Sequence, residues 1–417
     1  MNHMKNALIL LLVLTMAIGI LAGCQNTGAQ STTGSTTGTT APPPTEATGT
    51  GKDDVTNQGR YTVSDEDAIA VKDTVVATCG SYTLTNNQLQ IFYWMDAFNF
   101  IQNNYYYLSY YNLNPSVSLS MQVYDEKTGK TWEQHFLGQA IKSWTDFAVL
   151  MQIAQKENYE LSKDMQDALD KLESNLKETA DKNKFETVDA LIQADLGAGA
   201  DFANYKYYME LYYTASMFFT EKVEEFKVTD AEIEKYFEEH AKELETNYKV
   251  TKESGNLISV RHILLQPKNG KTENGKTTYS DAEWENCRKE AQALLDQWKA
   301  GKADEDSFAD LANEKSTDPG SNTNGGLYSG VTKGQMVEPF DTWIFDESRK
   351  YGDTGLVKTD YGYHIMFFVE AEPGWVYYSR DGVMGEKATE YLENAVKGYE
   401  TKVEYSKIAF AEISLAG

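Results

Sequence analysis

The spacing of apolar residues changes twice along this chain of 417 residues, and the two changes determine the expected domain plan. Over residues 85–246 apolar side chains recur every three or four positions, which predicts amphipathic helices. Residues 257–265 form a β-rich run, a second such run follows at 363–369, and helical spacing returns at 387–399. The expected parts are a mainly helical domain formed by residues 65–256 and 372–417, and an α+β domain inserted at 257–371.

Capping residues and strand patterns refine the expected elements. A strand over 73–80 ends in a Gly-Ser turn, and Thr229 with Glu232 has the spacing of a capping box at the start of a helix. The expected helices cover residues 85–101, 131–158, 162–183, 185–196, 201–226, 229–246, 281–300 and 307–313. A final strand over 403–413 is expected to pack back onto the helical domain.

The first 24 residues have the pattern of an export signal, because the apolar run at 7–21 is short for a membrane span. The run ends in Leu-Ala-Gly-Cys at Cys24, which resembles a bacterial lipobox and implies that this cysteine carries lipid. The alternative is an ordinary secretory signal with an incidental cysteine. Residues 25–64 are mostly small and polar, which predicts a disordered tether. We therefore expect an extracytoplasmic protein that is lipid-anchored to the bacterial cell membrane.

The charge balance excludes two classes of partner. The formal net charge is −25, from 63 acidic and 38 basic side chains, and the chain has no long cluster of Lys and Arg. Nucleic acid and anionic lipid surfaces both attract basic patches, so neither is an expected partner. Attachment to the membrane is expected through Cys24 alone.

The remaining cysteines, Cys79 and Cys287, lie far apart in the sequence. Two alternatives are open for them, a disulfide bridge or two buried free thiols. Neither Cys-x-x-Cys nor His-x-x-x-His spacing occurs among the cysteines and the five histidines. No structural metal and no cofactor are therefore expected.

Tyrosines are dense in two places of the helical part, around residues 105–111 and 205–213. A tyrosine presents a large apolar ring with a polar tip, which suits the rim of a helical core. The same property suits a groove that accepts varied unfolded segments. Both interpretations are open from the sequence.

Several short motifs follow one another in the inserted domain. In order, they are Val260-Arg261-His262-Ile263-Leu264, Phe308-Ala309-Asp310-Leu311-Ala312, Ser316-Thr317-Asp318-Pro319-Gly320-Ser321, Asn324-Gly325-Gly326-Leu327, Gly334-Gln335-Met336-Val337-Glu338-Pro339-Phe340 and Lys358-Thr359-Asp360-Tyr361-Gly362-Tyr363-His364-Ile365. This string resembles the parvulin (PpiC) family of peptidyl-prolyl isomerases over nearly the whole of residues 257–371. The resemblance implies a compact α+β fold and a peptide substrate with an X-Pro bond.

Rotation about an X-Pro bond requires neither a nucleophile nor a cofactor. Its barrier of about 18–20 kcal/mol arises from amide resonance. A site lowers the barrier when it holds the proline ring in an apolar socket and stabilises the changed charge on the amide. The resemblance implies catalytic roles for His262, Asp318, Thr359 and His364, and substrate-binding roles for Leu327, Met336 and Phe340.

Each of these residues also has a structural interpretation. Asp318 before a proline has the pattern of a turn residue, and Met336 and Phe340 have that of core residues, but the motif context favours the functional roles. For His262 and His364 a direct catalytic role and a structural role are both open. The chain departs from the family where many members have Gly-Gly-Asp-Leu and this sequence has Gly-Gly-Leu-Tyr, so substrate preference is expected to differ. No basic cluster suggests phosphorylated substrates.

The layout of signal, tether, helical domain and inserted parvulin domain resembles the PrsA-like foldases and, more distantly, the SurA-like chaperones. The resemblance implies a peptidyl-prolyl isomerase that assists the folding of exported proteins with X-Pro bonds. The alternative is a non-catalytic holdase that uses the parvulin fold to bind peptides. A third hypothesis is a structural surface lipoprotein with neither activity.

Overall fold

The structure is a computed structural model that describes residues 60–273, 276–413 and 415. The expected export signal, the lipid attachment at Cys24 and the tether up to residue 59 lie outside the described residues. Within the described part, no helix is both long and apolar enough to cross a membrane.

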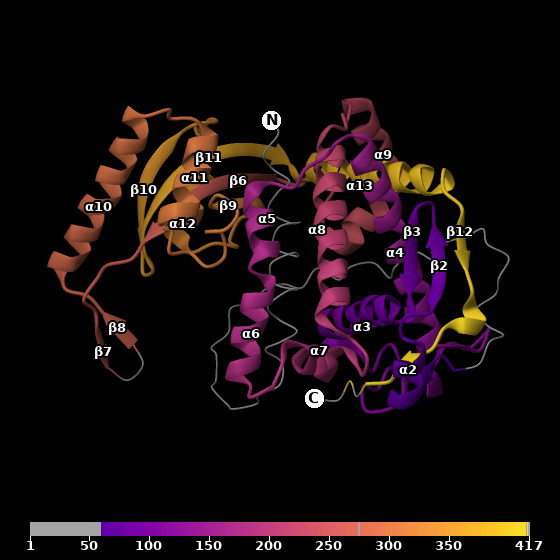
Figure 1. The fold of residues 1–417 in the computed structure, drawn as a ribbon. Coiled ribbons are helices and arrows are strands. Elements are labelled where there is room, and N and C mark those ends of the chain that lie inside the picture. The colour runs from indigo at the N-terminus through magenta and orange to yellow at the C-terminus, as the bar shows by residue number, and fades with distance from the viewer. Residues whose placement is uncertain (1–59, 274–275, 414, 416–417) are drawn as a thin grey trace. The chain divides into compact units, whose positions relative to one another are not determined.

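The described chain forms two compact units. Residues 226–386 form one, here called the sheet unit. Residues 60–225 and the stretch from residue 387 onward form the other, here called the helical unit. Figure 1 labels the elements of both.

The helical unit is built mainly from long helices. Its elements are β1 (Thr62–Val63), α2 (Asp65–Val71), β2 (Val75–Cys79), β3 (Tyr82–Thr85), α3 (Asn86–Asn103), η2 (Tyr105–Tyr107), η3 (Leu119–Met121), β4 (Val123–Asp125), β5 (Lys130–Thr131), α4 (Trp132–Lys156), α5 (Lys163–Asp170), α6 (Leu172–Lys182), α7 (Val188–Leu196), α8 (Phe202–Glu224), the end of α13 (Gly374–Lys397), β12 (Thr401–Val403), η4 (Tyr405–Lys407) and β13 (Phe410–Ala411). Thr85 and Thr131 start α3 and α4 with capping boxes. The tryptophans Trp94, Trp132 and Trp144 are fully buried in the core between these helices.

The two ends of the described chain meet in the helical unit. Strand β13 pairs in parallel with β1, with Phe410 opposite Thr62. The buried carboxylate of Glu133 accepts hydrogen bonds from the backbone amides of Tyr61 and Thr62. The predicted tether therefore extends too far: residues 60–64 belong to the fold, because Glu133 and β13 satisfy their backbone groups.

The two tyrosine-rich segments differ in exposure. On α8, Tyr205, Tyr208 and Tyr213 are buried, which fits the interpretation as core residues. Around η2, the side chains are open to solvent: Tyr105 is 67% exposed, Tyr106 90%, Tyr107 56% and Tyr110 81%. Packing in the core therefore does not explain the tyrosines around η2.

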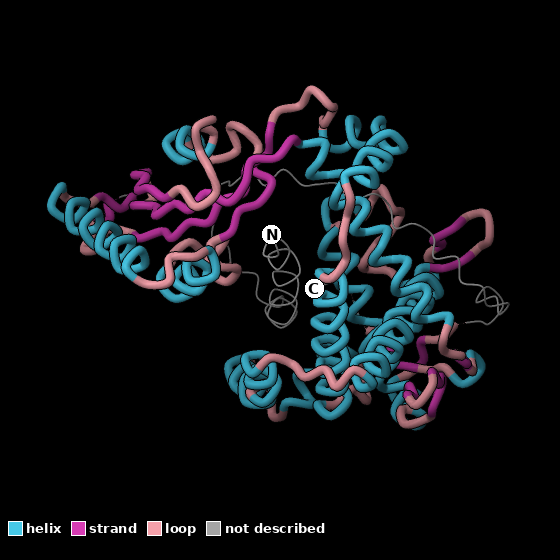
Figure 2. Tube along the Cα trace, turned by 90° about the horizontal axis from the view of Figure 1, so that it is seen from above, coloured by secondary structure: helices cyan, strands magenta, loops and turns pink. Residues whose placement is uncertain are grey.

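The sheet unit is built around a four-stranded antiparallel sheet with the order β10-β11-β6-β9. Its elements are α9 (Asp230–Tyr248), β6 (Asn256–Leu265), β7 (Lys271–Glu273), β8 (Lys276–Thr278), α10 (Asp281–Ala300), α11 (Glu305–Lys315), β9 (Leu327–Val331), α12 (Glu338–Ile344), β10 (Thr354–Thr359), β11 (Gly362–Pro373) and the start of α13. Figure 2 shows helices on either side of this sheet. The unit is α+β, as the sequence predicted.

Each face of the sheet packs against its own helices. On one face, Ile263 and Phe367 pack with residues of α10 and α11. On the other face, Val260 and Met366 pack with Phe340 and other residues of α12. Side chains alternate between the faces along each strand, so the register decides which residues lie on the α12 face.

Several predicted boundaries are wrong. The sequence placed residues 229–246 in the helical domain, but α9 belongs to the sheet unit, where its Phe237 ring lies 5.4 Å from that of Trp375 on α13. The predicted helix over 162–183 is two helices, α5 and α6. Strands β9 and β10 were not predicted, because their short polar sequences lack a clear apolar alternation.

The two cysteines within the described residues are free and buried. Cys79 lies in β2 of the helical unit and Cys287 in α10 of the sheet unit. Of the two alternatives, the structure therefore supports free thiols and excludes the disulfide bridge.

Candidate active site

The strand register brings two distant histidines together on the α12 face of the sheet. His262 of β6 lies opposite Met366 of β11, and His364 lies opposite Leu264. The two histidines are thus diagonal neighbours on one face, with their rings stacked at 5.1 Å. Both are buried, with exposed fractions of 2% and 5%.

A chain of short contacts runs through both imidazoles. Thr359 Oγ1 lies 2.8 Å from His364 Nε2, and His364 Nδ1 lies 2.9 Å from His262 Nδ1. At the other end, His262 Nε2 lies 3.1 Å from Asp318 Oδ2. The structure therefore brings together the four residues that the sequence predicted as catalytic.

One assignment of hydrogens satisfies every contact in this chain. Asp318 as a carboxylate can only accept, so His262 donates from Nε2 and accepts at Nδ1. His364 then donates from Nδ1 and accepts at Nε2. The Thr359 hydroxyl accepts from the amide of Tyr361 at 3.1 Å, which leaves its own hydrogen for His364. His364 is neutral in this arrangement.

Electrostatics agree with a neutral His364. Burial, and to a smaller extent the nearby His262, lower the pKa of His364 from 6.5 to about 3, although Asp318 acts in the opposite direction. A second proton would need a place on a nitrogen that already accepts a hydrogen bond. The imidazole is therefore held in its uncharged form across the physiological range.

Asp318 is held as a carboxylate by three donors on one oxygen. Besides His262, the hydroxyl of Ser321 donates to Oδ2 at 2.6 Å and the phenol of Tyr328 donates at 3.0 Å. Burial alone raises the pKa of Asp318, but the hydrogen bonds from these three residues and the influence of His262 together hold it well below its usual range. Within the described part of the chain, no hydrogen bond uses Oδ1.

An apolar wall adjoins the polar chain. Phe340 of α12 is buried, and its ring stands nearly perpendicular to the rings of His262 and His364, with centroids 5.3 Å from each. Met336 is half-buried and packs against the same apolar cluster. Both lie on the α12 face of the sheet, on the same side as the two imidazoles.

Leu327 does not lie with them, so its predicted place in the pocket is wrong. It pairs with Arg261, whose guanidinium bonds Glu305 of α11, and it therefore lies on the opposite face of the sheet. The next residue, Tyr328, pairs with Val260 and takes the place on the α12 face. The predicted residue is thus one position away from the residue that lies on the α12 face. Neighbouring residues of a strand point to opposite faces of the sheet, so a difference of one position changes the face.

Two further residues of the site were missed from the sequence. Tyr328 was noticed only as a departure from the family motif. Ser321 is fully buried, and its Oγ lies 3.1 Å from His262 Nε2 as well as bonding Asp318. Its spacing of three from Asp318, in a turn that contains Pro319, was the available signal.

The loop before β9 approaches the site closely through glycine. The backbone amide of His262 donates to the carbonyl of Gly326 at 2.8 Å. Gly326 has φ of +71°, and a Cβ there would lie 2.2 Å from the carbonyl oxygen of His262. Arg261 Nη1 donates to the carbonyl of Gly325 at 3.0 Å and fixes the loop from the other face.

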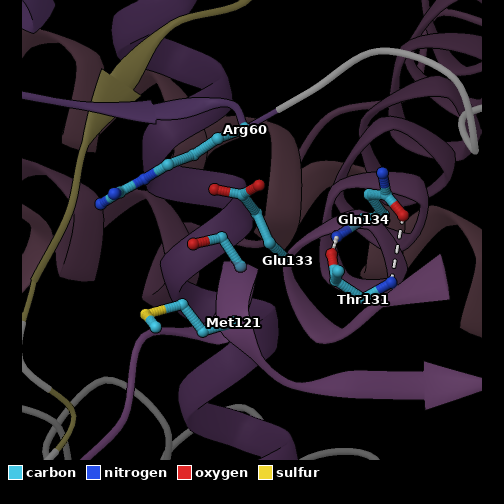
Figure 3. A pocket seen from close by; sticks show the side chains of 6 residues that line it. Arg60, Met121, Thr131, Glu133 and Gln134 are labelled. Atoms are coloured by element: carbon cyan, nitrogen blue, oxygen red, sulfur yellow. Dashed lines mark hydrogen bonds between the residues drawn. The ribbon is translucent and has the colours of Figure 1, made fainter. Parts of the chain in front are cut away.

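A pocket elsewhere in the molecule is a weaker candidate for a functional site. Figure 3 shows this pocket of about 350 Å³ in the helical unit. It is lined by Arg60, Ser120, Met121, Thr131, Glu133 and Gln134. Thr131 and Gln134 form hydrogen bonds with each other, and the carboxylate of Glu133 accepts a hydrogen bond from the backbone amide of Thr62 in β1. These polar groups therefore stabilise the fold. Among the described residues no cluster of His, Cys, Asp and Glu has the geometry of a metal site.

The neutral state of His364 makes the stability of the sheet unit depend on pH. The folded pKa of about 3 is below the ordinary 6.5, so the unfolded chain binds the proton first as pH falls. Stability is then lost from about pH 6.5 downward, by up to about 1.4 kcal/mol per pH unit. Asp318 does not change the stability between pH 6.5 and 4. Its pKa is lower in the folded protein than the ordinary 3.8, so the stability that its carboxylate contributes is lost only as the pH falls below 3.8.

Substituting His364→Gln should therefore flatten this dependence between pH 6.5 and 4. Native-state amide exchange of β6 and β11 measures the free energy of opening in the sheet unit alone. An H364Q variant with the same slope as the unsubstituted chain would contradict the assignment of a neutral His364.

Comparisons with known proteins agree with the resemblance found in the sequence. Residues 245–371 match the family described as PPIC-type PPIASE domain. Foldase protein PrsA 1 of Listeria innocua is 30% identical over 181 residues, which are 40% of this chain and 52% of that protein. Foldase protein PrsA of Geobacillus kaustophilus is 32% identical over 151 residues, which are 36% of this chain and 40% of that protein.

The chain matches only about half of the length of these relatives, or less. The crystal structure of PrsA from Bacillus subtilis is 21% identical, covers 72% of this chain and 95% of its own, and has a TM-score of 0.28, which is too low to support a conclusion. The family match confirms the resemblance for the sheet unit. Residues 245–371 thus have the sequence of a PPIC-type (parvulin) PPIASE domain, and the chain is similar to the PrsA foldases over part of their length.

Proposed function

We propose that the whole protein is a peptidyl-prolyl cis-trans isomerase and foldase that assists the folding of exported proteins. The observation that carries this proposal is the carboxylate of Asp318, held by the two-histidine chain beside the apolar wall of Phe340 and Met336, within the domain that matches the isomerase family. The geometry suits a reaction that breaks no covalent bond.

The apolar wall binds the proline ring. Phe340 and Met336 offer a ring face and a flexible thioether, which fit a five-membered ring without polar partners. Binding there removes water from the neighbouring amide. It also fixes the proline while the chain on the other side of the amide rotates.

Asp318 acts on the amide through its free oxygen. In the planar amide, resonance places negative charge on the carbonyl oxygen and positive charge on nitrogen, and twisting removes much of both. A carboxylate beside the carbonyl oxygen disfavours the planar amide more than the twisted one, so the barrier falls. His262, His364 and Thr359 act through Asp318 and are positioning residues, because they occupy Oδ2 and leave Oδ1 for the substrate.

Substitution of the site should lower the isomerisation rate without unfolding the protein. Asp318→Ala removes the carboxylate, and the double variant Met336→Ala with Phe340→Ala removes the wall. We expect kcat/KM for a proline tetrapeptide to fall about tenfold or more in each, which corresponds to about 1.4 kcal/mol of transition-state stabilisation. A protease-coupled assay on the chain from residue 25 onward measures this.

The matched control is Asp310→Ala, an exposed carboxylate on α11 of the same unit. It should keep the unsubstituted rate. Two results would overturn the proposal of an isomerase: a starting chain that leaves the tetrapeptide at its uncatalysed rate, or a D318A variant as active as D310A. In either case the non-catalytic holdase becomes the better hypothesis.

The exposed tyrosines support a second part of the proposal, the holding of unfolded clients by the helical unit. Tyr105, Tyr106, Tyr107 and Tyr110 present aromatic rings to solvent on one short segment. Rings of this kind bind varied extended segments with little loss of side-chain entropy. The relatives are called foldases, which is consistent with clients that are unfolded exported proteins.

Replacing these four tyrosines with serine should weaken the suppression of aggregation of a denatured client by several-fold. Light scattering of a refolding client measures it, and the tetrapeptide rate should stay unchanged because the sheet unit is untouched. Tyr351→Ser, at a 64% exposed tyrosine of the sheet unit, is the control. Equal suppression by the quadruple variant and the control would exclude the tyrosine segment as the client-binding surface.

Location at the outer face of the membrane rests on the sequence around Cys24. A lipid on this cysteine holds the protein at the membrane, and two or more acyl chains are needed for stable anchoring. Cys24→Ala should move the protein from the membrane fraction to the soluble extracytoplasmic fraction, as seen by fractionation and mass spectrometry. If the variant stays in the membrane fraction, the lipobox interpretation is wrong.

A further inference from the structure

Tyr328 occupies a position in the site that neither the sequence motif nor the family match assigns. It lies on β9 opposite Val260, on the α12 face of the sheet. Its ring is half-buried, packs against the apolar cluster that contains Phe340, and lies 5.3 Å from the ring of His262. Its hydroxyl donates to Asp318 Oδ2 at 3.0 Å. One side chain thus contacts both the apolar wall and the polar chain.

The phenol completes the set of donors that orients Asp318. Ser321 and His262 approach Oδ2 from the turn and from β6, and Tyr328 approaches from β9. With three donors on Oδ2, turning the carboxylate out of its plane would weaken all three bonds at once. Oδ1 is consequently the oxygen that a bound amide can meet.

Gly320 makes room for this phenol. A Cβ at Gly320 would lie 2.6 Å from the Tyr328 hydroxyl oxygen, which is closer than real Cβ atoms approach, and 3.6 Å from the ring carbon that bears the hydroxyl. Any side chain at residue 320 would therefore push the phenol, ring and hydroxyl together, away from Asp318. The backbone of the loop leading to Tyr328 is fixed as well, by the bonds of Arg261 and His262 to Gly325 and Gly326.

We propose that Tyr328 is a positioning residue for the isomerisation, whose hydroxyl fixes the orientation of Asp318 while its ring forms a third wall of the prolyl pocket. This rests on the proposed isomerase function. The two roles are separable, because phenylalanine keeps the ring and removes only the hydroxyl. A leucine would keep an apolar group of smaller size and remove the hydroxyl as well.

The ionisation of Asp318 provides a measurement that does not depend on activity. The titratable groups that face its carboxylate are His262 on β6, Tyr328 on β9 and, one residue further along the chain of contacts, His364 on β11. Donors to a carboxylate lower its pKa, so loss of the phenol should raise the pKa of Asp318. One hydrogen bond to a charged group corresponds to about one pH unit or somewhat more.

The test compares Tyr328→Phe with the control Tyr363→Phe in the chain from residue 25 onward. Tyr363 lies on β11 of the same sheet but on the opposite face, among the residues of α10 and α11. We expect Y328F to lower kcat/KM for the tetrapeptide about tenfold, mainly through kcat because the wall remains. In Tyr328→Leu we expect a similar loss in kcat together with a higher KM.

Two double variants separate a positioning role from a general structural one. Y328F added to D318A should cause no further loss of kcat/KM, because the hydroxyl acts only through the carboxylate. Gly320→Ala should reproduce the loss seen in Y328F, and should have little further effect in the Y328F background. Additive losses in either pair would overturn the proposal.

Carbon NMR of the Asp318 carboxyl group tests the contact between Tyr328 and Asp318 even if the protein is not an isomerase. The onset of protonation on lowering the pH should begin about one pH unit higher in Y328F than in Y363F. An inactive starting chain with this shift would refute the isomerase function while retaining the Tyr328–Asp318 coupling. The same onset in both variants, or Y328F as active as Y363F, would refute the role of Tyr328.

Discussion

The pairing of β6 with β11 is the constraint on which the site depends. Its register runs from Leu265 opposite Tyr363 to Asn256 opposite Pro373, and it places two histidines separated by 102 positions within 2.9 Å of each other. A shift of one residue in either strand would send one imidazole to the opposite face. The contacts to Thr359, Asp318 and Phe340 all start from these two rings, so the register determines the geometry of the whole site.

The structure brings most of the residues proposed from the sequence together, and they could be selected because their motifs are short and each lies on a single element. His262, Asp318, Thr359, His364, Met336 and Phe340 could be selected individually, and the sheet then brings them together. Leu327 could not be placed in this way, because its role depends on which residue of β9 opposes Arg261. Local sequence around two glycines does not set that register; it is set by the bonds from His262 and Arg261 to the loop.

The placement of α9 in the sheet unit could not be predicted from the sequence for a similar reason. The apolar face of α9 is evident from the spacing of Ile233, Phe237 and Leu244, but the spacing does not say which surface covers it. In the structure, Trp375 meets Phe237, and Tyr236 lies where a side chain at Gly382 of α13 would be, which ties α9 to the sheet unit. Amphipathic patterns identify a helix and its buried face, whereas the partner depends on contacts distant in sequence.

The site combines the charged carboxylate of Asp318 with an uncharged His364. The direction of the hydrogen bonds between them explains why each group keeps its charge state. Donors point in one direction, from Thr359 through His364 and His262 to Asp318, so the carboxylate receives the last hydrogen and remains an acceptor. A proton added to His364 would put a donor against the Thr359 hydroxyl, whose remaining acceptor capacity is shared with the Tyr361 amide. Burial and this hydrogen bonding therefore oppose protonation of His364, and the negative charge stays at Asp318, beside the apolar wall where an amide would bind.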